Sequence, residues 1–301
     1  MKAEIEEDSI FDIKKRIRQP KTMPEGPEVR RIAEGLGSVL VGSIIYGPTI
    51  TPQSRYHKNG LVNSHLFGEG AHVNAIVPKG KKIIFHLSLI PPYSGQIWMI
   101  SSLGMEGKWR FQRGNNSGIQ FTVLTCKMYP HYRHLHYQTL YYDDSRHFGS
   151  LEIGTGPIVL KDVGPSFMQD EVTLEHFATV VRNPRISSKP IGDFLLEQKY
   201  VSGIGNYLRA DILYLAQINP FRSCGSLSDN DIVQIYIASL DCFRTAYESN
   251  GHTIRTYFTP IGETGAYDPL VYNKSVSPAG NPVRKDELSK RTIHWDPIVQ
   301  Q

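Results

Sequence analysis

The hydrophobic pattern changes once along this chain of 301 residues, and that change limits the folds available to it. Apolar and polar side chains alternate in short runs through residues 39–150, with clusters of Gly, Pro and Asn between the runs. A period of two is typical of half-buried antiparallel strands. From residue 166 to 250 the apolar side chains instead recur with the helical period. The pattern therefore predicts an α+β fold, with an antiparallel β-sandwich or barrel followed by a helical part.

The predicted elements divide the chain into four parts. Helices are expected near 172–182, 188–198, 206–217 and 228–248, after an earlier helix that begins at Pro27. The charged N-terminal extension has too few apolar side chains for a core, so we expect it to be disordered or absent from the mature protein. The predicted parts are this extension at 1–22, a catalytic sandwich domain at 23–165, a helical domain at 166–265 and a hairpin tail at 266–301.

Composition excludes several classes of protein. The three cysteines, Cys126, Cys224 and Cys242, are far apart and form no CxxC pair, which excludes a disulfide framework and a cysteine-based zinc finger. No apolar run is long enough to span a membrane and no signal peptide is recognisable, so we expect an intracellular protein. The formal charge of +4 divides into +6 for residues 1–165 and −2 for the remainder. Charge alone is therefore weak support for a nucleic-acid partner.

Two short segments in the first half carry candidate chemistry. Met23–Arg31 (MPEGPEVRR) places Glu25 and Glu28 at the start of a predicted helix. A helix N-terminus favours ionised carboxylates and nearby phosphates, although helix capping alone would also explain the two residues. Val77–Phe85 (VPKGKKIIF) places Lys81 and Lys82 at a hairpin turn, where they are either exposed charges or ligands for a phosphate.

The most specific segment of the second half is Lys189–Asp211, in which two amphipathic helices flank a Gly-Ile-Gly-Asn turn. Glycine lets the backbone approach an anion closely. The N–H groups of this turn, the Asn206 side chain and the start of the following helix could together bind a phosphate. Backbone dipoles would then supply the attraction that the net charge of this half lacks.

These segments, together with Ser102–Gly107, Asp143–Gly149 and Val271–Trp295, resemble in order and spacing the formamidopyrimidine-DNA glycosylase and endonuclease VIII family. The resemblance covers about residues 23–301. It implies an N-terminal β-sandwich with flanking helices, a helix-two-turns-helix domain and a C-terminal finger hairpin. It also implies base excision repair by a bifunctional DNA glycosylase and abasic-site lyase that needs no cofactor.

The resemblance assigns the catalytic residues. Pro24 would be the nucleophile once it is the N-terminus, Glu25 the acid or base that acts on the deoxyribose, and Glu28 a supporting carboxylate. An α-amino group titrates at about 7.7–8, so more of it is unprotonated at neutral pH than of a lysine. A secondary amine can also attack the anomeric carbon of a sugar and form an iminium ion. Lys81 matches the catalytic lysine of the family best, and Lys82 remains an alternative.

The resemblance also assigns DNA contacts. Met105, Arg146 and Phe148 would fill the void left by an extruded nucleotide, although Met105 and Phe148 alone would be read as packing residues. The residues expected to contact phosphates are Lys189, Gly205, Asn206 and Arg291. The tail lacks the four cysteines of the usual zinc finger and more closely resembles a zincless finger, so no metal is expected. The histidines at 131, 134 and 136 are interpreted as a solvated strand edge.

The zincless finger points to oxidised pyrimidines such as thymine glycol and 5-hydroxycytosine, and to ring-opened purines. Residues 257–270 look short for the loop that holds 8-oxoguanine in relatives, which supports the same preference. The expected partner is damaged single- or double-stranded DNA, bound by a monomer.

An internal proline nitrogen is an amide and cannot act as a nucleophile. We therefore expect translation to start at Met23, followed by removal of this Met. The alternative is a non-catalytic damaged-DNA-binding protein in which the extension blocks Pro24. An RNA-binding or topoisomerase-like helix-two-turns-helix protein would leave Met23–Arg31 unexplained.

Overall fold

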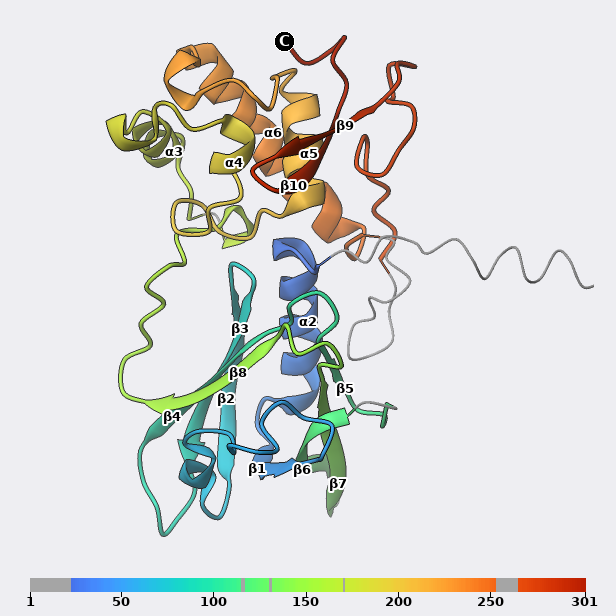
Figure 1. The fold of residues 1–301 in the computed structure, drawn as a ribbon. Helices are drawn as coiled ribbons and strands as arrows, with labels where there is room; N and C mark the ends of the chain where they lie inside the picture. The colour runs from blue at the N-terminus through green and yellow to red at the C-terminus, as the bar shows by residue number, and fades with distance from the viewer. Residues whose placement is uncertain (1–22, 115–116, 130–131, 170, 253–264) are drawn as a thin grey trace, which may run out of the picture.

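The computed structural model describes residues 23–301 except 115–116, 130–131, 170 and 253–264. A β-sheet forms one lobe and a cluster of helices forms the other, as Figure 1 shows. Helix α2 (Gly26–Leu40) lies along the sheet, and its N-terminal end reaches the helical lobe. The predicted extension at 1–22 lies outside the described residues.

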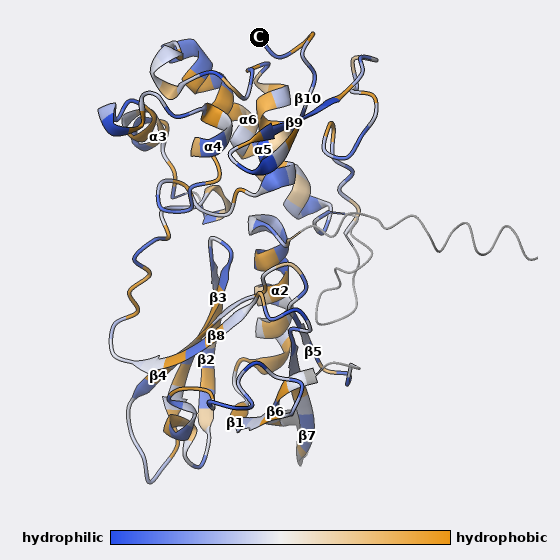
Figure 2. Ribbon diagram, in the orientation of Figure 1, coloured by the Kyte–Doolittle hydropathy of each residue, from blue (hydrophilic) through white to orange (hydrophobic). Residues whose placement is uncertain are grey.

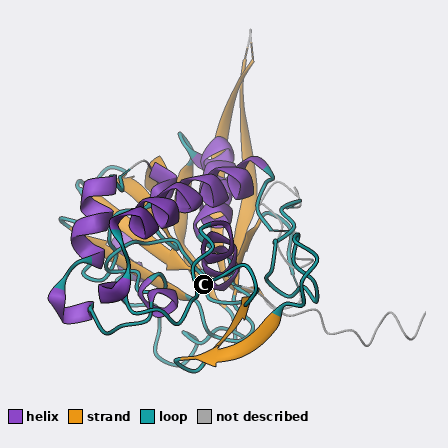
Figure 3. Ribbon diagram, turned by 90° about the horizontal axis from the view of Figure 1, so that it is seen from above, coloured by secondary structure: helices purple, strands orange, loops and turns teal. Residues whose placement is uncertain are grey.

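The first lobe is one antiparallel sheet of eight strands. They run in the order β5-β7-β6-β1-β2-β3-β4-β8. Their bounds are β1 (Ile44–Ile50), β2 (Ala71–Lys79), β3 (Lys82–Leu89), β4 (Gln96–Ser102), β5 (Lys108–Arg110), β6 (Ser117–Tyr129), β7 (Tyr132–Asp143) and β8 (Ser150–Thr155). The short 3₁₀ helix η1 (Ser64–Phe67) follows β1. In Figure 3 the β6–β7 hairpin projects well beyond the rest of the molecule.

The two ends of this sheet fold toward each other. The ring of Trp109 on β5 packs 5.2 Å from that of Phe85 on β3, and the Trp109 Nε1 donates a hydrogen bond to Ser101 Oγ on β4 at 3.0 Å. Helix α2 buries Val29, Ile32, Ala33, Leu36 and Leu40 in the same core. The predicted antiparallel β structure is confirmed, with the two faces of the sandwich formed by one continuous sheet.

The second lobe contains helices and short 3₁₀ turns. They are η2 (Phe167–Gln169), α3 (Leu174–Val181), η3 (Pro184–Ile186), α4 (Ile191–Phe194), α5 (Asn206–Leu215), η4 (Cys224–Ser226) and α6 (Asp229–Glu248). Figure 2 shows that their apolar segments gather where α4, α5 and α6 meet. Three of the four predicted helices are confirmed to within a few residues, and Ser228 caps α6 as expected.

The prediction of one continuous helix over 188–198 is wrong, because only Ile191–Phe194 forms an α-helix. After Phe194 the N–H groups of Leu196 and Glu197 bond to carbonyl groups only three residues back, at 3.1 and 3.0 Å. The chain therefore tightens into turns instead of continuing the α-helix. Its apolar side chains still pack into the core, which explains why the hydrophobic period suggested a longer helix.

A two-stranded hairpin completes the fold. Strands β9 (Arg284–Leu288) and β10 (Arg291–Trp295) pair antiparallel and lie beside α5. The α+β class, with its sheet, its helical region and its C-terminal hairpin, is therefore confirmed. None of the helices in the described ranges is long and apolar enough to cross a membrane.

Candidate active site

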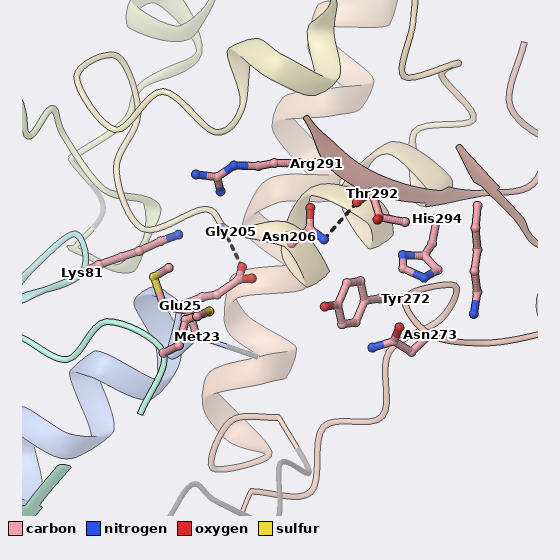
Figure 4. Close-up of a pocket in the computed structure, with 12 residues that line it drawn as sticks. Met23, Glu25, Lys81, Gly205, Asn206, Tyr272, Asn273, Arg291, Thr292 and His294 are labelled. Carbon is pink, nitrogen blue, oxygen red and sulfur yellow. Dashed lines mark hydrogen bonds between the residues drawn. The ribbon is translucent and has the colours of Figure 1, made fainter. Parts of the chain in front are cut away.

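A pocket of about 560 Å³ lies where the two lobes meet. The start of α2, the β2–β3 turn, the loop after β4, the start of α5 and the hairpin all contribute to it (Figure 4). Its lining residues are Met23, Glu25, Lys81, Met105, Gly205, Asn206, Tyr272, Asn273, Lys285, Arg291, Thr292 and His294. Segments far apart in the sequence therefore converge on one concave site.

The carboxylate of Glu25 is held by the start of α5. It accepts hydrogen bonds from the backbone N–H groups of Gly205 at 2.6 Å, Tyr207 at 3.0 Å and Leu208 at 3.2 Å. A Cβ atom at position 205 would lie 2.3 Å from the Glu25 carboxyl carbon, so only glycine fits there. The Gly-Ile-Gly-Asn turn thus holds a carboxylate of the chain itself at the helix N-terminus.

Glu25 and Lys81 influence each other's protonation. Burial raises the pKa of Glu25, although the Lys81 ammonium and the hydrogen bonds from Tyr207 and Gly205 act against it. Burial lowers the pKa of Lys81, and the charge of Glu25 opposes that shift. Because burial moves the two pKa values toward each other, each group can hold or release a proton closer to neutral pH than the same group in water.

The two lysines at the hairpin turn lie in different surroundings. Gly80, with φ of +56°, turns the chain so that Lys81 lies in the pocket near Glu25. Lys82 is the first residue of β3, pairs with Ser102 of β4 and is not among the lining residues. The geometry favours Lys81 over Lys82.

Glu28 lies behind Glu25 and does not line the pocket. Its Oε2 accepts from the Glu25 N–H at 2.8 Å, and its Oε1 accepts from the Tyr207 hydroxyl and the His252 N–H, both at 2.8 Å. Burial raises the pKa of this carboxyl. Glu28 therefore positions the Glu25 backbone, and Tyr207 is a partner that the sequence analysis did not identify.

Met23 lies in the pocket beside Glu25, whereas Pro24 is half-buried and is not a lining residue. The nitrogen of Pro24 is an amide because Met23 precedes it. Met23 thus fills part of the pocket wall, and Pro24 carries no free amine while Met23 precedes it.

The three void-filling candidates come from adjacent loops. Met105 lines the pocket, and a Cβ atom on its neighbour Gly104 would lie 2.5 Å from the Phe148 backbone. The Arg146 guanidinium lies 4.8 Å from the centroid of the Phe148 ring, and this ring is 53% exposed. Such an exposed aromatic ring beside a pocket suits insertion between bases.

The phosphate candidates divide into two groups. Gly205, Asn206 and Arg291 line the pocket, whereas Lys189 does not and pairs with Glu197. The sequence analysis missed several lining residues on and before the hairpin: Tyr272, Asn273, Lys285, Thr292 and His294. Lys285 and His294 are cross-strand partners, and this register could not be read from the sequence.

Within the described residues, no group of three or more His, Cys, Asp or Glu side chains could hold a metal ion. His136 is exposed on β7, whereas the side chains at 131 and 134 lie outside the described part of the chain. Residues 257–264 of the loop that was expected to be short also lie outside the described part of the chain.

The comparisons with known proteins all point to the same family. The model of the formamidopyrimidine-DNA glycosylase N-terminal domain matches residues 23–151, and that of its H2TH domain matches residues 163–258. The formamidopyrimidine-DNA glycosylase of Listeria innocua is 30% identical over 93% of this chain and all of its own length. That of Enterococcus faecalis is 29% identical over 93% of this chain and 98% of its own.

Solved structures extend the comparison to DNA complexes. A mutant Lactococcus lactis Fpg protein bound to DNA containing Fapy-dG has a TM-score of 0.77 and 26% identity, over 92% of this chain and all of that one. The wild-type protein bound to DNA containing an oxidised pyrimidine has a TM-score of 0.75 and 25% identity over the same shares. The chain therefore belongs to the formamidopyrimidine-DNA glycosylase family, and it is a DNA glycosylase for damaged DNA with the abasic-site lyase activity of that family.

Proposed function

We propose that this enzyme uses the amine of Pro24, after removal of Met23 and of everything before it, as the nucleophile for both base release and strand cleavage. The observation that carries this proposal is the buried Glu25, whose raised pKa and contact with α5 leave a proton-carrying carboxyl one residue from Pro24. Such a carboxyl suits acid catalysis on the sugar at neutral pH.

The chemistry would proceed in two stages. The Pro24 nitrogen attacks the anomeric carbon and loses its own proton to solvent as the bond from that carbon to the damaged base breaks, and Lys81 donates the proton that the leaving base needs. Glu25 protonates the ring oxygen, which opens the sugar and gives an iminium ion. Loss of a proton from the neighbouring carbon then expels the 3′ phosphate, and a second elimination expels the 5′ phosphate.

The proposed substrates are oxidised pyrimidines and ring-opened purines in single- or double-stranded DNA, bound by a monomer. The similarity to a protein solved with DNA containing an oxidised pyrimidine, and with DNA containing Fapy-dG, supports this substrate class. Met105, Arg146 and Phe148 would fill the void, and Asn206 and Arg291 would hold the backbone phosphates. Gly205, expected from the sequence to contact a phosphate, instead donates its N–H to Glu25. The finger hairpin would act without metal.

Borohydride trapping on abasic-site DNA tests the nucleophile, with mass mapping of the adduct. A chain that begins at Pro24 should form an adduct at its N-terminus, and the chain that begins at residue 1 should form none. An adduct on Lys81 or Lys82 would overturn the assignment of Pro24 while keeping the lyase activity. Tight binding of damaged DNA without any adduct, in both chains, would favour the non-catalytic damaged-DNA-binding protein.

A further inference from the structure

Arg209 is a fully buried arginine in the first turn of α5, directly behind the pocket wall, with an exposed fraction of 0%. Its guanidinium donates to three oxygens that carry no formal charge: Gly192 O at 3.4 Å, Thr292 O at 3.1 Å and Asn206 Oδ1. Its Nε has no hydrogen-bond partner among the described residues.

This side chain remains a cation under physiological conditions. Burial lowers the pKa of Arg209 to about 10, with the charge of Asp193 opposing the shift and that of Arg291 adding to it. Burying a cation whose hydrogen bonds go to neutral oxygens is costly in free energy. Its place beside Asn206 offers a reason to keep it, because its planar donor fork orients the Asn206 amide at the pocket wall.

Arg209 also joins two residues of the pocket wall. Because Asn206 Oδ1 accepts from Arg209, the amide is turned so that its donor group Nδ2 faces the other way. This Nδ2 donates to Thr292 O at 3.0 Å, and Arg209 donates to the same carbonyl oxygen. Figure 4 shows Asn206 between Glu25 and Thr292, with Arg291 next in the chain. One guanidinium thus sets the orientation of Asn206 and ties β10 to α5.

We propose that Arg209 is a positioning residue for a DNA phosphodiester, which keeps the Asn206 amide oriented as a donor at the pocket. The inference rests on the proposed function, because it takes Asn206 and Arg291 as backbone contacts. A phosphate that reaches the pocket would replace Thr292 O as the acceptor of the Asn206 amide, while Arg209 remains buried behind it.

Equilibrium binding to duplex DNA with a tetrahydrofuran abasic-site analogue tests this role, because that analogue is bound without base release. The variants are Arg209→Met, Asn206→Ala and the double variant, each measured over a range of salt concentrations. Each single variant should weaken binding about tenfold. The double variant should bind at most about twofold more weakly than Asn206→Ala, because both changes remove the same interaction.

The salt dependence separates positioning from direct contact. Arg291→Gln should lower the slope of log affinity against log salt by about one phosphate contact, whereas Arg209→Met should leave that slope unchanged. Arg244→Met is the matched control, since it removes a cation from an exposed pair on α6. It should bind with the affinity of the parent.

Three results would overturn the role of Arg209: parental affinity in a folded Arg209→Met protein, multiplicative losses in the double variant, or a lowered salt slope. If Asn206→Ala binds like the parent, the proposed phosphate contact itself fails. If Arg209→Met does not fold, Arg209→Lys keeps the charge but lacks the planar fork that meets Asn206 and Thr292 together. It should still weaken binding severalfold with an unchanged salt slope, and parental affinity there would refute the inference.

Discussion

Glu25 is subject to two opposing effects. Hydrogen bonds from the start of α5 and the nearby Lys81 ammonium stabilise its ionised form, whereas complete burial destabilises that form. Burial is the larger effect, so the pKa of Glu25 rises although three N–H groups point at the carboxylate. A carboxyl of this kind can give up a proton in the reaction and remains held in place when it does.

Glu25→Gln should lower the rate of base release at least about a hundredfold, which is the usual size of an acid-base contribution. The amide cannot donate the proton, and its NH₂ group would face the N–H donors of α5. Glu34→Gln, an exposed change on the same helix, is the control. Single-turnover base release by chains that begin at Pro24 measures both, and equal rates would contradict the role of Glu25.

Lys81 and Lys82 should differ in their contribution to base release. Lys81→Ala should abolish most base release, because Lys81 lies beside Glu25 in the pocket. Lys82→Ala should retain the parental rate within about twofold, because an exposed or half-buried strand lysine contributes little. The sequence analysis could not separate these neighbours, since the turn at Gly80 decides which of them enters the pocket. The reverse pattern of rates would reassign the catalytic lysine to Lys82.

The finger hairpin is stabilised at its base by the buried carboxylate of Asp296. Asp296, with an exposed fraction of 0%, directly follows β10 and accepts from Ser277 Oγ at 2.7 Å and from Asn281 Nδ2 at 3.0 Å, both of which precede β9. Its other oxygen accepts from the N–H groups of Ile298 and Val299. Although burial acts against it, the hydrogen bonds from Ser277 and Asn281 lower the pKa of Asp296. These hydrogen bonds join the segment that precedes β9 to the segment that follows β10.

Asp296→Asn should lower the free energy of unfolding by about 2 kcal/mol, because its NH₂ group would meet the donors of Ser277 and Asn281. Asp268→Asn, at an exposed pair with Lys274, should change stability by less than about 1 kcal/mol. Denaturant unfolding measures both variants. A chelator should leave the parent midpoint unchanged, and a midpoint that falls with chelator would indicate a metal in the finger.

The hairpin was predictable from the sequence, but the contacts that hold it were not. The missing cysteines and the strand pattern of the tail predict the hairpin, because both are local features. The Ser277–Asp296 contact joins residues 19 positions apart, and nothing in the local pattern distinguishes Asp296 from an ordinary surface carboxylate. The helix predicted over 188–198 was too long for a related reason, since tight turns and an α-helix can bury the same apolar side chains.

At the scale of the whole molecule, the pocket exists only where both lobes meet. The motifs identify Glu25, Lys81, Asn206 and Arg291 separately, and the fold brings all four to one site. Side chains to which no motif assigned a role, such as Tyr207, Arg209 and His294, join the site through long-range packing. Hydrophobic patterning is a local property and cannot specify such contacts.

Two buried histidines near this junction give a prediction about stability and pH. Burial lowers the pKa of His252 and of His294 to about 4, with the charge of Asp268 opposing the shift at His252. Unfolded histidine titrates at about 6.5, so the folded state resists taking up these protons. The stabilisation is complete above about pH 6.5 and is lost as pH falls toward 4, by on the order of 3 kcal/mol for each histidine.

His294→Phe keeps an aromatic ring in the same space and removes one of these titrations, so its unfolding free energy should fall less steeply than that of the parent between pH 6.5 and 4. The raised pKa values of Glu25 and Asp211 act in the opposite direction and are common to both proteins, so the difference between the two curves isolates His294. His136→Phe, an exposed change on β7, is the matched surface control. Parallel curves for the His294→Phe protein and the parent would mean that His294 is protonated as readily in the folded protein as in the unfolded chain.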